Sequence, residues 1–186
     1  MNEKQAPLIF MKVGNHAGES WDEILTRKRQ EYEKTGQIFW GYGGGSCHPL
    51  TQVQPFARLA VKKFGSIYLV MEPIESRAEP EILPATEYSP DGVNWLPMPD
   101  GISVLGSRFA LVLDEIKPHD LELRLEEFEV GVGPSRGKSA RDYLTGRIDK
   151  ACLHPARAGD VDNPTIRTAK FAAELKEPYA VLLRSR

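Results

Sequence analysis

The first 74 residues alternate between apolar, strand-like runs and amphipathic, helix-like runs, and this alternation constrains the fold more than any other feature of the chain. The strongest helix signal covers 53–64, where apolar residues recur at i, i+3 and i+4 before Gly65. A helix is also expected at 20–35, because Ser20 and Glu23 have capping-box spacing. Strands are expected at 8–13, 37–42 and 66–74. This order predicts two crossovers and a partly parallel sheet.

The second half of the chain predicts an antiparallel strand pair at 109–116 and 121–132. Apolar alternation slips by one residue near Glu126, as it does at a β-bulge. A third helix is expected to begin near Ser139, because a helical apolar stripe continues as far as Cys152. Two further segments are expected: a short helix at 168–175 and a terminal strand at 178–184.

The chain length predicts one domain spanning 1–186. Its expected class is α/β (or α+β): a mixed sheet with an N-terminal βαβαβ unit, about three main helices and an antiparallel strand pair in the second half. Residues 75–106 are rich in proline and glycine and predict an irregular arm packed on the domain. Hydrophobic residues make up 41% and charged residues 27%, which is typical of globular proteins. No apolar run reaches the roughly 18 residues of a membrane span.

Charge and cysteine content narrow the expected partners and location. The formal net charge of −2 gives no general attraction to nucleic acid. The basic run 26–30 lies among glutamates, and Glu23 and Arg27 have i,i+4 spacing, so a solvated helix face explains these charges as well as a nucleic-acid surface does. With two cysteines and no recognisable export signal, a cytoplasmic location is expected.

Three glycine-containing loops, "VGNHAGES", "GYGGGSCHPLT" and "GVGPSRGKS", each precede an expected helix. Backbone N–H groups at helix starts bind anions, and loops at the carboxyl ends of parallel strands meet in one crevice. We therefore expect a pocket for a small anionic or phosphate-bearing ligand. The expected binding residues are Gly43, Gly44, Gly45 and Ser46 as backbone donors, Arg136 and Lys138 as cations, and Ser139 at the third helix start.

Two nucleotide motifs are close to these loops but do not match them. In "GVGPSRGKS" the first P-loop glycine position is occupied by Val132, so the spacing fails by one residue. "GYGGGS" has serine in place of the last glycine of the dinucleotide pattern. The sequence therefore names no cofactor.

A cysteine-dependent enzyme is a second hypothesis, because Cys47 precedes a helix whose N-terminus lowers a thiol pKa. Catalysis requires a base, and the expected catalytic set is Cys47 with His16 or the adjacent, poorly directed His48. Two more histidines, His119 and His154, stay open as the base.

Metal ions and protein partners are two further kinds of ligand for which the sequence offers candidate residues. The residues Cys47, His48, Cys152 and His154 form a candidate zinc set, but their spacing departs from that of known zinc sites, and no metal is predicted. A protein-interaction or inhibitor module is a third hypothesis for the function. Its surface would be the 75–106 arm, which carries Tyr88, Trp95 and Met98.

Overall fold

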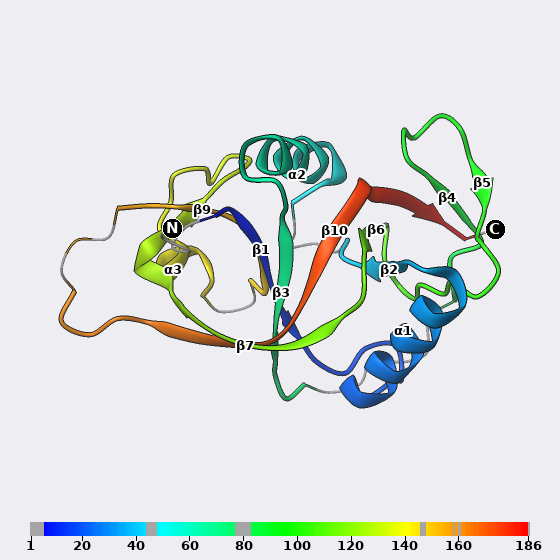
Figure 1. Ribbon diagram of the computed structural model, residues 1–186, viewed down its shortest axis with the longest axis horizontal. Helices are drawn as coiled ribbons and strands as arrows, with labels where there is room; N and C mark the ends of the chain where they lie inside the picture. Colours follow the sequence, from blue (N-terminus) through cyan, green and yellow to red (C-terminus); the bar gives the residue numbers. More distant parts are fainter. Residues whose placement is uncertain are drawn as a thin grey trace.

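The computed structural model describes residues 6–43, 48–76, 83–145, 148–157, 159 and 161–185. Within these ranges three helices accompany one mixed sheet of ten strands (Figure 1). The helices are α1 (Trp21–Thr35), α2 (Leu50–Phe64) and α3 (Ala140–Tyr143), and the strands are β1 (Leu8–Val13), β2 (Ile38–Gly41), β3 (Tyr68–Pro73), β4 (Glu87–Ser89), β5 (Leu96–Pro97), β6 (Phe109–Leu113), β7 (Lys117–Arg124), β8 (Phe128–Val130), β9 (Lys150–Pro155) and β10 (Ile166–Arg184). The predicted α/β class is confirmed.

The sheet runs in the order β2-β6-β10-β3-β1-β9-β8, and β4, β5 and β7 branch from it. β1 and β3 are parallel, with Ile9 opposite Leu69, so the predicted partly parallel sheet is confirmed. β2 pairs antiparallel with β6 at the end of the sheet and does not lie beside β1. The long strand β10 joins the two halves, because its first part pairs with β3 and β7 and its last part with β6 and β4.

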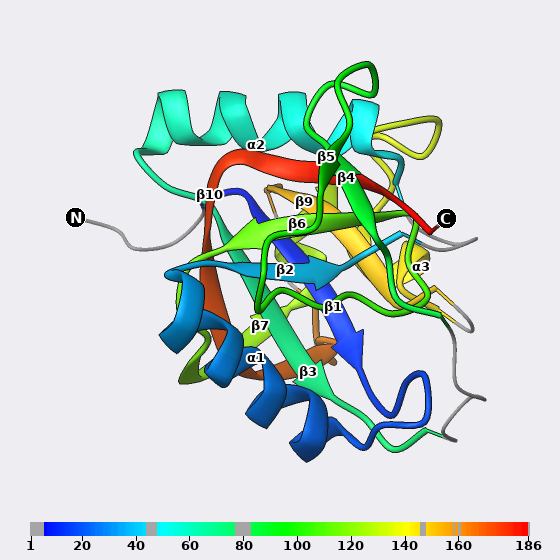
Figure 2. The same ribbon diagram turned by 90° about the vertical axis from the view of Figure 1, so that its right-hand side faces the viewer.

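Both long helices form where the sequence predicts them. Ser20 and Glu23 make the complete capping box at the start of α1, and Gly36 ends the helix in the left-handed conformation. Figure 2 shows α2 above and α1 below the strands β2 and β6. Apolar faces of both helices pack into one core cluster with β1, β2, β3 and β6, which fixes α1 beside the ends of these strands.

The helix expected from Ser139 to Cys152 is wrong beyond its first turn. α3 ends at Tyr143, and the residues from Lys150 onward form β9, antiparallel to β1. This segment forms a strand because it pairs with the edge of β1 that lies opposite β3. In β9, Cys152 is buried in the cluster with α2, and its neighbours in sequence are buried in a second cluster on the other face of the sheet.

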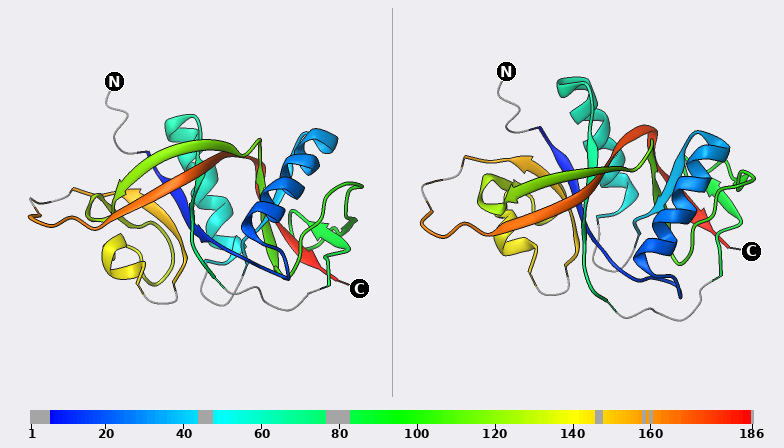
Figure 3. Two further views of the ribbon diagram at one scale, coloured as in Figure 1. Left: turned by 90° about the horizontal axis from the view of Figure 1, so that it is seen from below. Right: turned by 60° about the horizontal axis from the view of Figure 1, so that its bottom comes forward.

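Two more local expectations differ from the structure. The helix expected at 168–175 is part of β10, which runs beside β7 as a long arch in Figure 3. The slip near Glu126 is a 3-10 turn at Leu125–Glu127 between β7 and β8, and its extra residues restore the apolar alternation. None of the helices in the described ranges has the length and apolar character needed to cross a bilayer.

Within the described part of the 75–106 arm, β4 and β5 form a hairpin that packs on the end of β10. The ring of Tyr88 contacts Phe39 edge to face at 5.2 Å, and the Arg184 guanidinium lies 4.1 Å from the centre of the Trp95 ring. Tyr88 and Trp95 therefore both contact other residues of the domain.

Candidate functional site

A cavity of about 500 Å³ lies beyond the carboxyl ends of β1 and β3. It is lined by the ends of β1 and β2, the first two turns of α1, the segments 14–16 and 104–107, and the start of β9. Because β1 and β3 are parallel, their arrowheads point to the same edge of the sheet in Figure 2. Ligands of open α/β sheets bind at this kind of position.

Lys150 brings the ammonium group of a nearly buried side chain to this cavity. It is the first residue of β9, lies opposite Met11 of β1, and is 9% exposed. Its Nζ is 3.6 Å from Asp149 Oδ1 and 5.7 Å from the centre of the Tyr42 ring. The Asp149 carboxylate forms an ion pair with this ammonium at a distance longer than a hydrogen bond, and no described residue accepts a hydrogen bond from it. Lys12, Arg27 and Lys28, the other lysines and arginine that line the cavity, each donate a hydrogen bond within the described part of the protein, and Lys150 does not.

Lys12 approaches the same edge from the other face of β1. Its Nζ donates a hydrogen bond of 3.4 Å to the carbonyl of Ile148. Burial lowers the pKa of Lys12, and the nearby Arg167 lowers it further, whereas Glu72 and Asp149 act in the opposite direction. Glu72 and Arg167 themselves form an ion pair at 3.6 Å. Lys12 therefore belongs to a group of nearly balanced charges.

Arg27 lines the cavity, but its guanidinium already forms hydrogen bonds with other groups of the protein. It forms a two-pronged ion pair with Glu19, with N···O distances of 2.7 and 2.6 Å, and donates to the Ser103 carbonyl at 2.8 Å. The expected i,i+4 partner of Arg27 was Glu23, whose carboxylate instead accepts a bond from the Ser20 N–H in the capping box.

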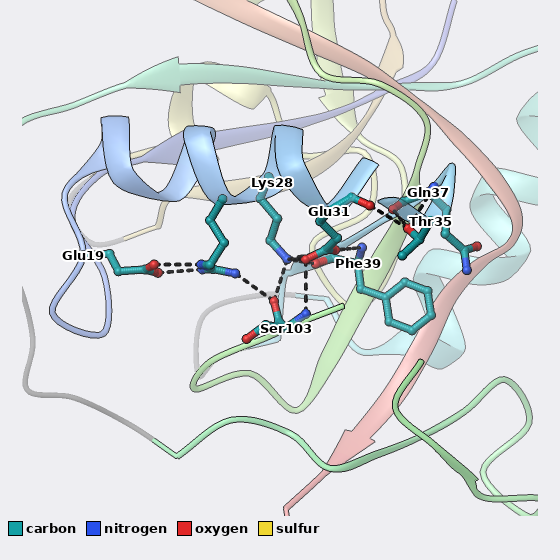
Figure 4. A network of polar contacts seen from close by, with 8 residues as sticks. Glu19, Lys28, Glu31, Thr35, Gln37, Phe39 and Ser103 are labelled. Carbon is teal, nitrogen blue, oxygen red and sulfur yellow. Dashed lines mark hydrogen bonds and ion pairs between the residues drawn. The ribbon is translucent and has the colours of Figure 1, made fainter. Parts of the chain in front are cut away.

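Lys28 also lines the cavity, and its ammonium group forms a buried ion pair with Glu31 (Figure 4). Its Nζ donates to both Glu31 oxygens, at 3.1 and 2.9 Å, and to the carbonyls of Phe39 and Ser103, at 2.6 and 2.7 Å. Burial lowers the pKa of Lys28 to about 8, so it stays charged at neutral pH. The interpretation of 26–30 as a wholly solvated face is therefore wrong at Lys28, which is 3% exposed.

Glu31 completes this network along the free edge of β2. Its carboxylate accepts the Phe39 N–H at 2.8 Å and the Ser103 N–H at 3.2 Å. Both backbone groups of Phe39 that face away from β6 are thus satisfied by the two charged side chains of α1. The pair takes the place of a neighbouring strand, and it joins α1, β2 and the segment around Ser103 into one cavity wall.

Aromatic side chains form the wall on the α1 side. Trp40 Nε1 donates to the sulfur of Met11 at 3.2 Å. The ring of Trp21 lies 6.0 Å from Trp40 at an angle of 71°, and 5.2 Å from Phe171 at 60°. The cavity therefore has an ammonium group at the β9 side and two indole rings, nearly at right angles to each other, at the α1 side.

Two of the sequence-predicted site residues, Gly43 and His16, line this cavity. Gly43 donates its N–H to the Phe109 carbonyl at 3.1 Å, and a Cβ there would come within 2.9 Å of the Phe109 backbone nitrogen. Close packing thus explains this glycine. His16 Nε2 contacts the Leu105 carbonyl at 3.1 Å. Gly44, Gly45, Ser46 and Cys47 lie outside the described residues.

The remaining predicted residues lie elsewhere. His48 is buried and stacks on Tyr143 at 5.8 Å with an angle of 7°, and this burial lowers its pKa. Arg136 and Lys138 are exposed, Ser139 precedes α3, and none of the three lines the cavity. Of the predicted residues that the structure describes, Gly43 and His16 line the cavity and the other four do not.

The candidate zinc ligands that the structure describes serve as packing groups. Cys152 is fully buried in β9, and the His154 ring lies 4.9 Å from Phe56. Burial, followed by the nearby Arg136, lowers the pKa of His154. In the part of the chain that the structure describes, no three His, Cys, Asp or Glu side chains are grouped as a metal site.

The four lining residues Lys12, Lys150, Trp21 and Trp40 were not predicted. A polar residue near the carboxyl end of a parallel strand was a usable signal for Lys12. Lys150 gave no such signal, because it fell inside the expected third helix. No protein-family model, curated protein or solved structure matches this chain.

Proposed function

We propose that this protein binds a small anionic ligand in the cavity at the ends of β1 and β3, with the anionic group beside the Lys150 ammonium. The observation that carries the proposal is the position of Lys150: it is nearly buried, faces the cavity, and has no hydrogen-bond acceptor among the described residues. Asp149 pairs with this charge at 3.6 Å but accepts no hydrogen bond from it, and burying a charge is costly unless it is hydrogen-bonded as well as paired. An anionic ligand would supply the missing acceptor.

The residues proposed here differ from those that the sequence suggested, which were Arg136 and Lys138 for the charge and the glycine loop 43–46 for the backbone donors. At the start of α1, the Glu23 N–H is bonded to Ser20 Oγ and the Trp21 N–H to the Asn15 side chain. Gly43 also uses its N–H within the protein. These described backbone donors are engaged within the protein, and the proposal therefore uses the Lys150 side chain for recognition. A reducing, cytoplasmic location remains part of the proposal, in keeping with two cysteines in the sequence.

Iodide quenching of tryptophan fluorescence tests this proposal directly. In a Trp95→Phe protein the two remaining tryptophans, Trp21 and Trp40, both line the cavity. Lys150→Met should lower the iodide quenching constant at least threefold, because the ammonium attracts the anion. Quenching by neutral acrylamide should be unchanged.

Lys170→Met provides the matched control, because Lys170 is an exposed lysine paired with Asp120 and does not line the cavity. This control should leave both quenching constants unchanged. Equal iodide quenching with and without Lys150 would overturn the assignment of the anion to this cavity.

A further inference from the structure

The size and walls of the cavity also constrain the body of the ligand. At about 500 Å³ the cavity is far larger than an inorganic anion and lies within the range of small-molecule sites. Polar and apolar groups contribute about equally to its lining, and the apolar side chains include Trp21, Trp40 and Ile24. A bare anion would leave most of this apolar surface uncovered, so the walls favour a ligand with an organic body.

The arrangement of the two indoles favours a flat body. Trp21 and Trp40 meet at 71°, so their rings form a corner. A planar ring placed beside this corner would contact mainly Trp21, by stacking or edge to face, and both geometries are favourable for aromatic pairs. Trp21 is half-buried and Trp40 is 5% exposed, so Trp21 has more surface to offer a ligand.

The local charges set the expected charge of the ligand. At this end of the cavity two lining residues, Lys12 and Lys150, are cations and one, Asp149, is a carboxylate, whereas the Arg167 and Glu72 pair does not line the cavity. One positive charge is therefore in excess at this end of the cavity. The two lining cations on α1 are neutralised by their own glutamates. A single negative charge balances the site.

From these observations we infer that the ligand is a planar aromatic monoanion, such as an aromatic carboxylate, with its ring at the Trp21 and Trp40 corner and its anionic group at Lys150. This inference rests on the proposed function, because it names the class of ligand for the same cavity. Trp21 is then a binding residue that selects flat rings.

Isothermal titration calorimetry with two acids of equal charge separates the ring from the anion. We expect 1-naphthoate to bind at least tenfold more tightly than cyclohexanecarboxylate, which is not planar. Trp21→Leu should lower the affinity for 1-naphthoate at least fivefold, and Trp21→Phe should have an affinity close to that of the wild type. Thermal melts of both variants control for folding, because Trp21 also packs on Phe171.

The outcomes separate the two proposals. If both acids bind equally and both lose affinity in Lys150→Met, the anion site stands and the inference about the ring is overturned. If neither acid binds, both proposals are overturned. If 1-naphthoate binding is unchanged by Trp21→Leu in a folded protein, the ring does not lie at this corner and the inference fails.

Discussion

Replacing Lys28 by methionine is expected to lower the free energy of unfolding by about 3–5 kcal/mol at pH 7, the usual cost of removing one partner of a buried ion pair. Glu31 would keep a buried charge without its cation, because the pair is nearly inaccessible, with side chains 3% and 1% exposed. The carbonyl of Phe39 would lose its Lys28 donor as well. Urea unfolding of the two proteins measures the difference.

A matched control comes from a lysine with an equally short ion pair at the surface. Lys170 and Asp120 are 2.6 Å apart, but their side chains are 54% and 81% exposed. Exposed pairs contribute between about 0 and 1 kcal/mol, so Lys170→Met should change stability little. A loss at Lys28 no larger than the loss at Lys170 would contradict a structural role for the buried pair.

The double variant Lys28→Met with Glu31→Leu is expected to remain at least about 2 kcal/mol less stable than the wild type. Replacing both partners of a buried pair by apolar residues is often neutral or stabilising. Here the pair also satisfies backbone groups at the edge of β2, because Phe39 donates to Glu31 and accepts from Lys28, and the Ser103 N–H donates to Glu31. Each buried group left without a partner costs about 1–3 kcal/mol.

Hydrogen exchange identifies the cause of that loss. The amides of Phe39 and Ser103 should exchange faster in the double variant, whereas the amide of Gly36, which is bonded to the Tyr32 carbonyl at the end of α1, should follow only the global change. Wild-type stability in the double variant would show that the two charges are dispensable for closing the edge of β2.

The elements that were predicted from the sequence are those whose signals are local. The capping box at Ser20 and the apolar periodicity of α2 depend on residues a few positions apart, and both helices form as expected. The segment from 140 to 152 has apolar residues that suit a helix, yet its second half is a strand because β1 lies beside it. That contact joins residues more than 130 positions apart, and no local pattern contains it.

The candidate site was harder to predict for a related reason. Lys28 lies in a basic run that looks solvated, and its burial depends on Phe39 and on Ser103, which is 75 residues away in sequence. Lys150 reaches the cavity only because β9 pairs with β1. By contrast, the placement of a crevice at the carboxyl ends of parallel strands follows from the order of elements, and the cavity is found there.

The measurement that tests the proposed anion site most directly is an NMR titration of the 15N-labelled protein with 1-naphthoate. We expect the largest amide shifts in 11–16, 104–107 and 149–150, which surround Lys150 and line the cavity. Shifts confined to 133–139, the loop before α3, or to the hairpin at 87–97 would contradict this expectation and would move the binding surface to one of the sites that the sequence alone suggested.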